Sequence, residues 1–355
     1  MKKLVCFVLS LFLIASLFSG CGTEVSKDTG KTFQFTDSVG RTVNVPKEIA
    51  RVAASGSIAQ MMILTLAPEL LVGVSDDLDT EQLPYLPECI RSLPVFGQFY
   101  GSRANLNLEA LMEADPQIII DLGNVKSSIR EDMDTVQAQT GIPTVFIEEE
   151  LTSLPAAYRA LGTLLGREEK AEQLAVYIEQ TLSMAEENAA KIPQEDRLTV
   201  LFGTGPDGLA CNARGSMQAD VIELVGAINV VEPLEATNRN GGTIVDPEQA
   251  YAYDPDLLLL TADGPYDSIE SSTLSELRAV KNGSYYEIPE YPYNWMCSPP
   301  SVNRVLGIRW LGNLLYPEVF DYDMVAETQT FYRLFWGYEL STEEAEGMLA
   351  RSTLK

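Results

Sequence analysis

The chain has 355 residues, of which 46% are hydrophobic, and it carries a formal net charge of −26. This length suits about two domains, and the hydrophobic content is enough for a buried core. The charge argues against non-specific binding to nucleic acid or anionic lipid, and the absence of histidine excludes Ser-His-Asp catalysis, Cys-His catalysis and histidine-bound metal sites.

Residues 1–20 have the pattern of a signal peptide. Lys2 and Lys3 precede an apolar run over residues 4–18, shorter than the roughly 20 residues that a membrane span needs. The sequence then reads Leu-Phe-Ser-Gly before Cys21, which resembles a bacterial lipobox, so we expect lipidation at Cys21. Ordinary cleavage with Cys21 as a stray thiol is the alternative. A lipid anchor there would hold a soluble body at the extracytoplasmic face of the cell membrane.

The rest of the chain alternates strand-like and helix-like segments in two halves. Residues 21–32 are polar and are typical of a flexible tether. The alternation runs through residues 33–153 and starts again in residues 194–355. This repeated order predicts an α/β fold of two lobes, each with a mainly parallel sheet flanked by helices.

Apolar runs bounded by turn residues predict the strands, and longer amphipathic stretches predict the helices. In the first half we expect strands at residues 33–35, 42–45, 51–54, 70–74, 93–96, 118–120 and 144–147, with helices after residue 57 and at 108–114 and 126–140. In the second half we expect strands at residues 198–202, 257–260 and 284–288, with helices at 218–226, 246–253, 273–280, 301–316, 324–336 and 342–351.

The stretch between the halves, residues 167–191, contains no Gly or Pro and is rich in strong helix formers. Leu174, Ile178 and Leu182 recur every four residues and form an apolar stripe. About 25 residues at 1.5 Å each span roughly 37 Å, the width of a domain. We expect residues 154–193 to be a helical linker whose spine, residues 167–191, joins the lobes; a long helix inside one domain is the alternative.

Two local sequence features bear on binding. The turn at residues 55–57 follows a buried strand and opens a helix, so Ser57 lies where backbone N–H groups face a ligand in α/β units. The segment LNLEALMEADP from residue 106 is echoed by IVDPEQAYAYDP from residue 244. Each half therefore has a helix with an early Glu and an Asp-Pro stop before a buried strand.

Eight motifs along residues 33–335 resemble, in the same order, those of the substrate-binding lipoproteins of ABC importers for iron–siderophores, haem and vitamin B12, the class III periplasmic binding proteins. They are DSVGRTVNVPKEIARV, LLVGVSDD, NLEALMEADPQIII, LGREEKAEQLA, DVIELVGAINVV, DPEQAYAYDPDLLLL, LRAVKNGSYYEIP and RWLGNLLYPE. The resemblance implies two lobes joined by one long helix. It also implies a monomeric binding protein, not an enzyme, that delivers an iron chelate or a corrinoid such as cobalamin to an ABC permease dimer.

The resemblance also assigns one exposed glutamate on each lobe to docking with the permease. Glu109 and Glu248 occupy these motif positions, and two carboxylates far apart on a rigid body set orientation by charge complementarity. The alternative is that each is a first-turn acid that is favourable to the dipole of its own helix.

A cleft between the lobes would be lined by the loops that follow the strands. In these loops, Arg103 and Arg214 suit an anionic chelate through bidentate bonds, with an ordinary surface position as the alternative for each. Tyr100, Tyr293 and Trp295 suit stacking on catechol, haem or corrin rings. The absence of histidine favours an intact chelate held by shape and charge, with no catalytic residue, cofactor or metal site of the protein's own.

Two further alternatives stay open at this point. A binding protein of the same fold for an oxyanion such as molybdate or tungstate would use Ser, Thr and backbone N–H groups. An extracellular hydrolase would need an acid pair or a nucleophile elbow, and neither is evident. Cys89, Cys211 and Cys297 match no metal motif and allow either one disulfide or three free thiols.

Overall fold

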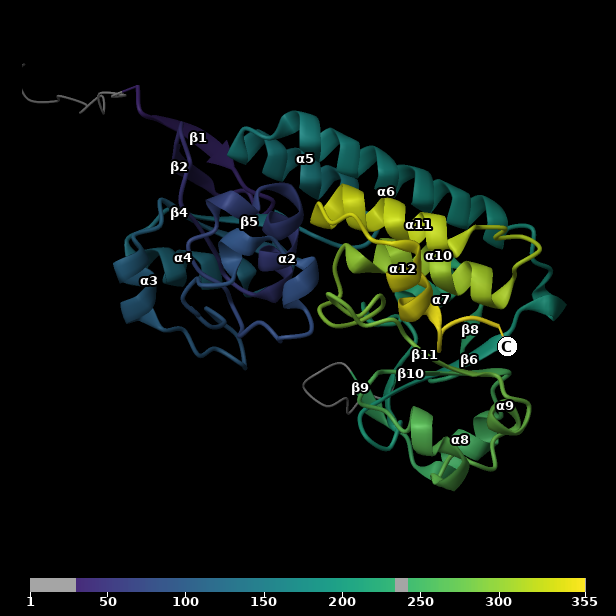
Figure 1. Cartoon of the computed structure of the whole chain (residues 1–355). Helices are drawn as coiled ribbons and strands as arrows, with labels where there is room; N and C mark the ends of the chain where they lie inside the picture. The colour runs from purple at the N-terminus through teal and green to yellow at the C-terminus, as the bar shows by residue number, and fades with distance from the viewer. Residues whose placement is uncertain (1–29, 234–241, 355) are drawn as a thin grey trace, which may run out of the picture.

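The computed structural model describes residues 30–233 and 242–354. Figure 1 shows two lobes, with the long helix α6 (Glu168–Ala189) running from one to the other and α5 (Leu154–Leu165) beside it. The expected fold class is confirmed. Cys21 and the expected signal peptide lie outside the described residues. Among the helices that the structure describes, none is long and apolar enough to cross a membrane.

The N-terminal lobe is built on three parallel strands in the order β3-β4-β5, beside an antiparallel hairpin of β1 and β2. Its strands are β1 (Thr32–Thr36), β2 (Thr42–Pro46), β3 (Val52–Ala54), β4 (Ile118–Gly123) and β5 (Thr144–Glu148). Its helices are α2 (Ser57–Leu66), α3 (Leu108–Ala114) and α4 (Ile129–Thr140). Ile118, Ile119 and Ile120 are fully buried, because helices cover both faces of this sheet.

Two expected strands, at residues 70–74 and 93–96, are wrong. Each is reduced to a single parallel bridge, Leu71 with Val52 and Val95 with Val74. Pro68 begins a 3₁₀ turn, η1 (Pro68–Leu70), and Pro94 has no N–H to donate to a ladder. The chain from residue 75 to 92 is consequently loop, with the short turns η2 (Leu83–Tyr85) and η3 (Glu88–Ile90).

The long helix α6 lies inside the predicted range and is about 33 Å long at 1.5 Å per residue. It follows α5 after a turn at Gly166, which has a left-handed φ of 64°. The two helices approach closely at small residues: a Cβ on Gly162 would lie 2.4 Å from that of Ala171. Arg159 of α5 also pairs with Glu172 and Glu179 of α6. The linker is thus a helix pair, and only α6 runs the full distance between the lobes.

The C-terminal lobe has a mixed sheet in the order β11-β10-β6-β7-β9, with β8 beside β6. Its strands are β6 (Thr199–Thr204), β7 (Ala210–Asn212), β8 (Ile228–Asn229), β9 (Gly242–Ile244), β10 (Leu257–Leu260) and β11 (Tyr285–Glu287). The pairings of β6 with β8, β6 with β10 and β10 with β11 are parallel, whereas β7 is antiparallel to both of its neighbours. β7, β8 and β9 were not expected, because Asn212, Asn229 and Gly242, residue types that are depleted in strands, interrupt any apolar run there.

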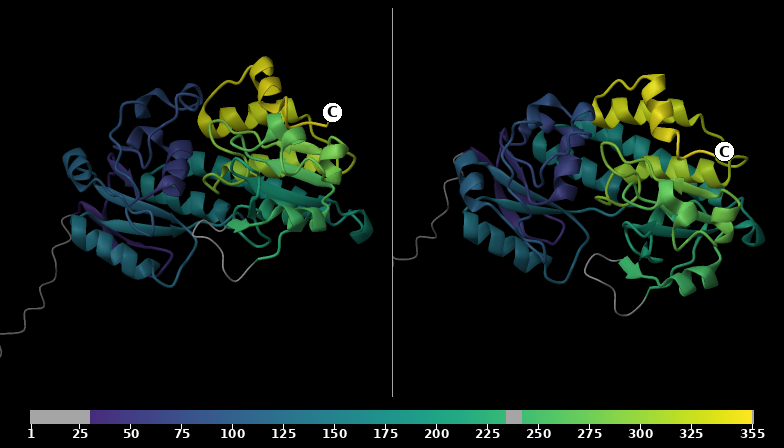
Figure 2. Two further views of the ribbon diagram at one scale, coloured as in Figure 1. Left: turned by 90° about the horizontal axis from the view of Figure 1, so that it is seen from below. Right: turned by 60° about the horizontal axis from the view of Figure 1, so that its bottom comes forward.

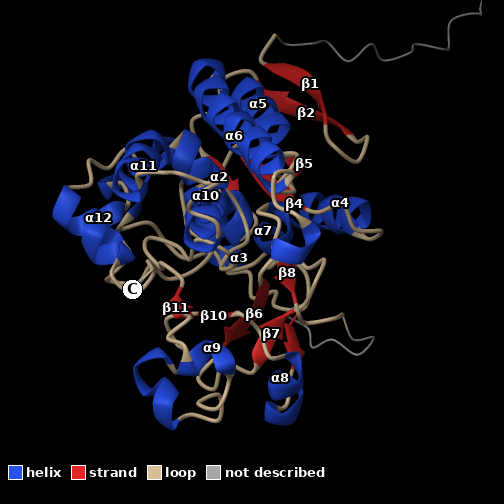
Figure 3. Cartoon of the chain, turned by 90° about the vertical axis from the view of Figure 1, so that its right-hand side faces the viewer, coloured by secondary structure: helices blue, strands red, loops and turns tan. Residues whose placement is uncertain are grey.

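Helices cover both faces of this sheet, with α8 and α9 on one side and α7 and α10 on the other (Figure 3). Their bounds are α7 (Asp220–Leu224), α8 (Pro247–Tyr253), α9 (Arg278–Lys281) and α10 (Asn303–Leu315). The tail contains α11 (Met324–Phe331), a π-helical turn (Tyr332–Trp336) and α12 (Thr342–Leu349). The helix expected at residues 273–280 is mostly wrong, since only α9 and the preceding 3₁₀ segment η5 (Tyr266–Ser271) form.

One hydrophobic core passes from the first sheet through α6 into the second lobe, and it includes Ile118, Leu174 and Phe202. The helical tail returns to the N-terminal lobe, as the two views of Figure 2 show. There Tyr332 packs edge-on against Tyr85, with ring centroids 5.9 Å apart. The lobes are therefore held together at more than one place. The three cysteines of the described residues are free thiols.

Candidate functional site: a cavity between the lobes

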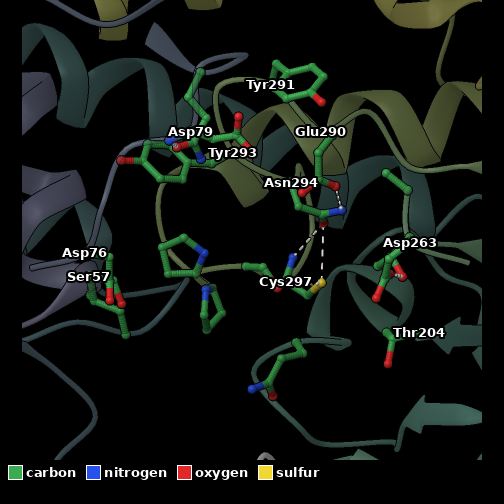
Figure 4. A pocket seen from close by; sticks show the side chains of 18 of the residues that line it. Ser57, Asp76, Asp79, Thr204, Asp263, Glu290, Tyr291, Tyr293, Asn294 and Cys297 are labelled. Carbon is green, nitrogen blue, oxygen red and sulfur yellow. Dashed lines mark hydrogen bonds between the residues drawn. The ribbon is translucent and has the colours of Figure 1, made fainter. Parts of the chain in front are cut away.

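A cavity of about 860 Å³ lies between the lobes. Its walls come from the start of α2, the loop at residues 76–82, the loops after β6 and β10, and the loop at residues 290–300. Most of these segments follow the carboxyl ends of parallel strands, where open α/β sheets bind ligands. Figure 4 looks into this space, with Asp76 on one side and Thr204 and Asp263 on the other.

A second cavity of about 540 Å³ adjoins the first, lined mostly by the N-terminal lobe and also by Met217 of the C-terminal lobe. The two share Ser57, Ile58, Asp76 and Arg103 as lining residues, so they form one continuous space. No side chain caps the N-terminus of α2, which begins at Ser57 on this shared wall. Ser57 is therefore at the position that its place in the sequence predicts.

Asp121, at the end of β4, sets the chemistry of the smaller cavity. Its carboxylate accepts hydrogen bonds from the Ser55 hydroxyl and, at 2.5 Å, from the Tyr100 hydroxyl. Burial raises the pKa of Asp121 to about 6, against the opposing effect of those bonds and of Lys126. Burial and Asp121 together raise the pKa of Tyr100. The proton of the Tyr100 hydroxyl is thus engaged by Asp121, which leaves the hydroxyl oxygen as an acceptor and the ring for contact with other groups.

The loop at residues 290–300 forms the upper wall and is organised by Asn294, which is fully buried. Its side-chain oxygen accepts from the backbone N–H groups of Met296 and Cys297 at 3.0 and 3.1 Å, and its amide donates to Glu290 at 2.9 Å. Because buried polar groups are costly unless paired, this set of bonds holds the loop in one conformation.

Tyr293 of the same loop faces the main cavity and is 9% exposed. Its hydroxyl accepts a hydrogen bond of 3.4 Å from Gln60 of α2, and its ring packs against Trp336. A residue of the second lobe therefore contacts a helix of the first at the cavity wall.

Two of the residues expected at the ligand lie elsewhere. Trp295 is 2% exposed, packs edge-on against Trp310 of α10 and does not line either cavity. Arg214 pairs with Glu232 at 2.9 Å, donates to the Asn229 carbonyl and lines neither cavity. The loop around Trp295 folds its indole under α10. Neither Trp295 nor Arg214 therefore lines a cavity, and their contact with a ligand stays a prediction that this geometry does not support.

The other four residues that the sequence predicts for ligand binding line the cavities. Ser57 and Arg103 lie on the wall that both cavities share, Tyr293 lines the larger cavity and Tyr100 lines the smaller one. The structure brings them together from segments far apart in the sequence, and their ligand contacts stay a prediction.

The acidic lining of the cavity was not expected from the sequence. Its carboxylates are Asp76, Asp77, Asp79, Asp263 and Glu290. Among the described residues, none of the five takes part in an ion pair, and Arg103 is the only basic residue that lines this cavity. The Asp-Asp pair after the apolar run at residues 70–74 was the available signal for part of this lining.

Glu109 and Glu248 lie in the first turns of α3 and α8, and both are exposed. The two helices match each other in structure as they do in sequence. Asn107 and Asp246 cap their N-termini by accepting from backbone N–H groups. Each helix has seven residues and ends at an aspartate in the left-handed conformation. The two glutamates thus occupy equivalent positions in α3 and α8, and these helices lie on the outer sides of the two lobes (Figure 1).

This fold and cavity are those of a two-lobed binding protein, with a candidate ligand site between the lobes. A family model described as periplasmic binding protein matches residues 97–292, more than half of the chain, and the chain belongs to that family. It is 22% identical over 341 residues to YvrC of Bacillus subtilis, named an uncharacterized ABC transporter substrate-binding lipoprotein, with 90% of this chain and 99% of that protein covered. The protein is thus a substrate-binding protein of the ABC transporter type and not an enzyme.

Solved structures agree with this assignment. An ABC transporter solute binding protein from Sulfurospirillum deleyianum is similar with a TM-score of 0.82 and 27% identity, covering 89% of this chain and 99% of that one. The molybdate-bound protein MolA of Haemophilus influenzae is similar with a TM-score of 0.70 and 19% identity, covering 87% and 99%. At 19% identity the second likeness concerns the fold alone.

Proposed function

We propose that this protein captures a metal chelate or a corrinoid in the cavity between its lobes and delivers it to an ABC permease. The observation that carries the proposal is the cavity of about 860 Å³ lined from both lobes. This volume falls within the range of small-molecule sites, about 300–1,000 Å³. Tyr293 and its neighbour Tyr291 supply aromatic surface on the wall, which suits a ligand with extended rings or a bulky organic shell.

Docking to the permease is assigned to Glu109 and Glu248. Each carboxylate is exposed, and each has exposed apolar side chains nearby on its own lobe. Met112 is 50% exposed on α3, and Ile244 is 66% exposed just before α8. An acid beside exposed apolar surface on each lobe suits a partner that contacts both lobes at two sites a fixed distance apart.

The anchor is assigned to Cys21, which follows the expected signal peptide. Lipidation there, with residues 21–32 as a tether, would keep the lobes close to the membrane at the extracytoplasmic face. The name of YvrC as a lipoprotein supports this proposal.

The first experiment is a thermal-shift panel on the mature domain with ferric siderophores, haem, cobalamin and molybdate. We expect one chelate or corrinoid to raise the melting temperature and molybdate to leave it unchanged, because carboxylates repel an oxyanion. Ala262→Trp fills the exposed edge of the cavity and should abolish the shift, whereas Ala138→Trp on α4 should not. A shift with molybdate alone would favour the oxyanion alternative, for which the likeness to MolA is the motivation.

The second experiment tests docking in cells. Glu109→Lys with Glu248→Lys should abolish ligand uptake while ligand binding to the purified protein is kept. Glu113→Lys with Glu131→Lys makes the same change in net charge at exposed positions of α3 and α4 and should leave uptake intact. Uptake that survives the first pair would mean that these residues only stabilise their own helices.

A further inference from the structure

Carboxylates surround the cavity from both lobes. Asp76, Asp77 and Asp79 come from the loop that follows the bridge at Val74, on the N-terminal side. Asp263 follows β10, and Glu290 follows β11, on the C-terminal side (Figure 4). A ligand between the lobes therefore meets negative charge on both sides.

Neutral donors hold these carboxylates in place. Asp76 accepts from the Gln98 amide at 3.0 Å, and Asp263 accepts from the Thr261 hydroxyl at 2.6 Å. Glu290 accepts from Asn294 at 2.9 Å. Such bonds orient an acid without supplying an opposing charge, so the carboxylates that are ionised keep a negative potential in the cavity.

One guanidinium opposes the five carboxylates. Arg103 lies on the wall shared by the two cavities, beside Ser57 and Asp76. The smaller cavity adds Lys126 but also Asp121, so acidic residues still outnumber basic residues along the two cavities. An anionic chelate would face like charges at several points, whatever pairing it made with Arg103.

Resting on the function proposed above, we infer that the ligand of this cavity carries net positive charge: a cationic metal complex, or a chelate that bears ammonium groups. A cation gains from the carboxylates on both lobes at once. The rings of Tyr291 and Tyr293 on the same wall add a surface that attracts cations through their faces. Anionic catecholate or carboxylate chelates and oxyanions are disfavoured by the same field.

The test uses two inert octahedral complexes of similar size and opposite charge, tris(ethylenediamine)chromium(III) and tris(oxalato)chromate(III). Calorimetry of the mature protein at about 0.15 M salt measures both, so that distant surface charges are largely screened. We expect measurable binding of the cation and none of the anion. Asp76→Asn with Asp263→Asn and Glu290→Gln should weaken cation binding by at least about tenfold.

A matched control removes the same charge from outside the cavity. Glu169→Gln, Glu187→Gln and Glu346→Gln lie on the exposed faces of α6 and α12 and should change the affinity less than twofold. If the cavity triple does not fold, as judged by its thermal transition, Asp77→Asn with Asp79→Asn serves instead, with at least about fivefold weakening expected.

Three results would overturn the inference: equal or tighter binding of the anion, no measurable binding of the cation, or equal weakening by the cavity and control variants. None of these three outcomes by itself contradicts the proposed transport function. If the inference fails while a chelate of the thermal-shift panel still stabilises the protein and uptake still needs Glu109 and Glu248, the transport role stands and only the charge of the ligand is revised.

Discussion

The guanidinium of Arg304 lies 3.4 Å from the carboxylate of Glu149, and both side chains are fully buried. Glu149 follows β5 of the N-terminal lobe, whereas Arg304 lies in the first turn of α10 of the C-terminal lobe. Asp220, at the start of α7, pairs with the same guanidinium at 2.7 Å. One cation therefore joins acids of both lobes inside the shared interior.

Removing that cation should destabilise the protein strongly. Arg304→Met leaves Glu149 fully buried and Asp220 partly buried without their partner, and breaking a buried pair in this way costs about 3–5 kcal/mol. Urea denaturation measures the loss. Arg278→Met removes an exposed guanidinium that pairs with Asp254 and Asp256, and it should have little effect. Equal losses in the two variants would contradict a special role for the buried cluster.

The cluster also predicts how stability depends on pH. Burial raises the pKa of Glu149 to about 7, from 4.5, although Arg304 opposes the change. Because the folded pKa is the higher one, the native state binds the proton more tightly, so the contribution is full below pH 4.5 and is lost as pH rises through 7. Burial also raises the pKa of Asp220, to about 6, so the contribution of Asp220 to stability is likewise lost as pH rises.

We therefore expect the melting temperature to fall between pH 6 and pH 8, and Glu149→Gln to reduce this fall by roughly 2–4 °C. Calorimetric scans across this range measure the difference. Glu187→Gln, at an exposed position of α6, should leave the slope unchanged. If the melting temperature rises from pH 6 to pH 8, and does so equally in both variants, the pKa of Glu149 is not raised in the folded state.

Ligand binding should depend on pH through Glu290. Burial raises the pKa of this group to about 7; the Asn294 hydrogen bond lowers it, while Asp263 and Glu287 raise it further. The carboxyl is mostly neutral at pH 6 and mostly charged at pH 8, so affinity for tris(ethylenediamine)chromium(III) should rise roughly three- to tenfold over that interval. Calorimetry at both pH values tests this, and Glu290→Gln should remove most of the rise.

Close packing of α10 against the cavity loop predicts a steric effect at Gly307. A Cβ at this position would lie 2.2 Å from the Trp295 carbonyl oxygen, a backbone atom that cannot turn aside. Gly307→Ala should cost about 1–3 kcal/mol in urea denaturation. Gly347→Ala in α12 meets nothing within 4 Å and should stabilise by about 0.5–1 kcal/mol. If both variants gained stability, the loop would have to move freely against α10.

The lobes should move little on binding, by on the order of a few Å, because α6, the common core and the tail join them. Spin labels on Glu113→Cys of α3 and Gln249→Cys of α8 report this distance with and without ligand, in a Cys89→Ser background. Burial raises the pKa of Cys211 and Cys297 to about 12, so these thiols should stay unlabelled. A wide clamshell rotation would contradict this prediction.

Local patterns were sufficient for much of the fold. The long helix α6 was predictable because helix formers without Gly or Pro leave the segment no competing conformation. The matched helices α3 and α8 were predictable from their capping residues and Asp-Pro stops. The short strands β7 and β9 were not, because their formation depends on pairing with β6 and with each other.

The sequence by itself determined the two-lobed α/β class, the helix between the lobes, the early acid in one helix of each half and the absence of histidine chemistry. These follow from periodicity, capping and composition, which act over a few residues. Only the tertiary structure decided which side chains line the cavity between the lobes. It buried Trp295 beneath α10, turned Arg214 toward Glu232 and gathered Asp76, Asp263 and Glu290 around one cavity. Side chains far apart in the chain meet only where strand ends converge, and no local pattern encodes which of them point inward.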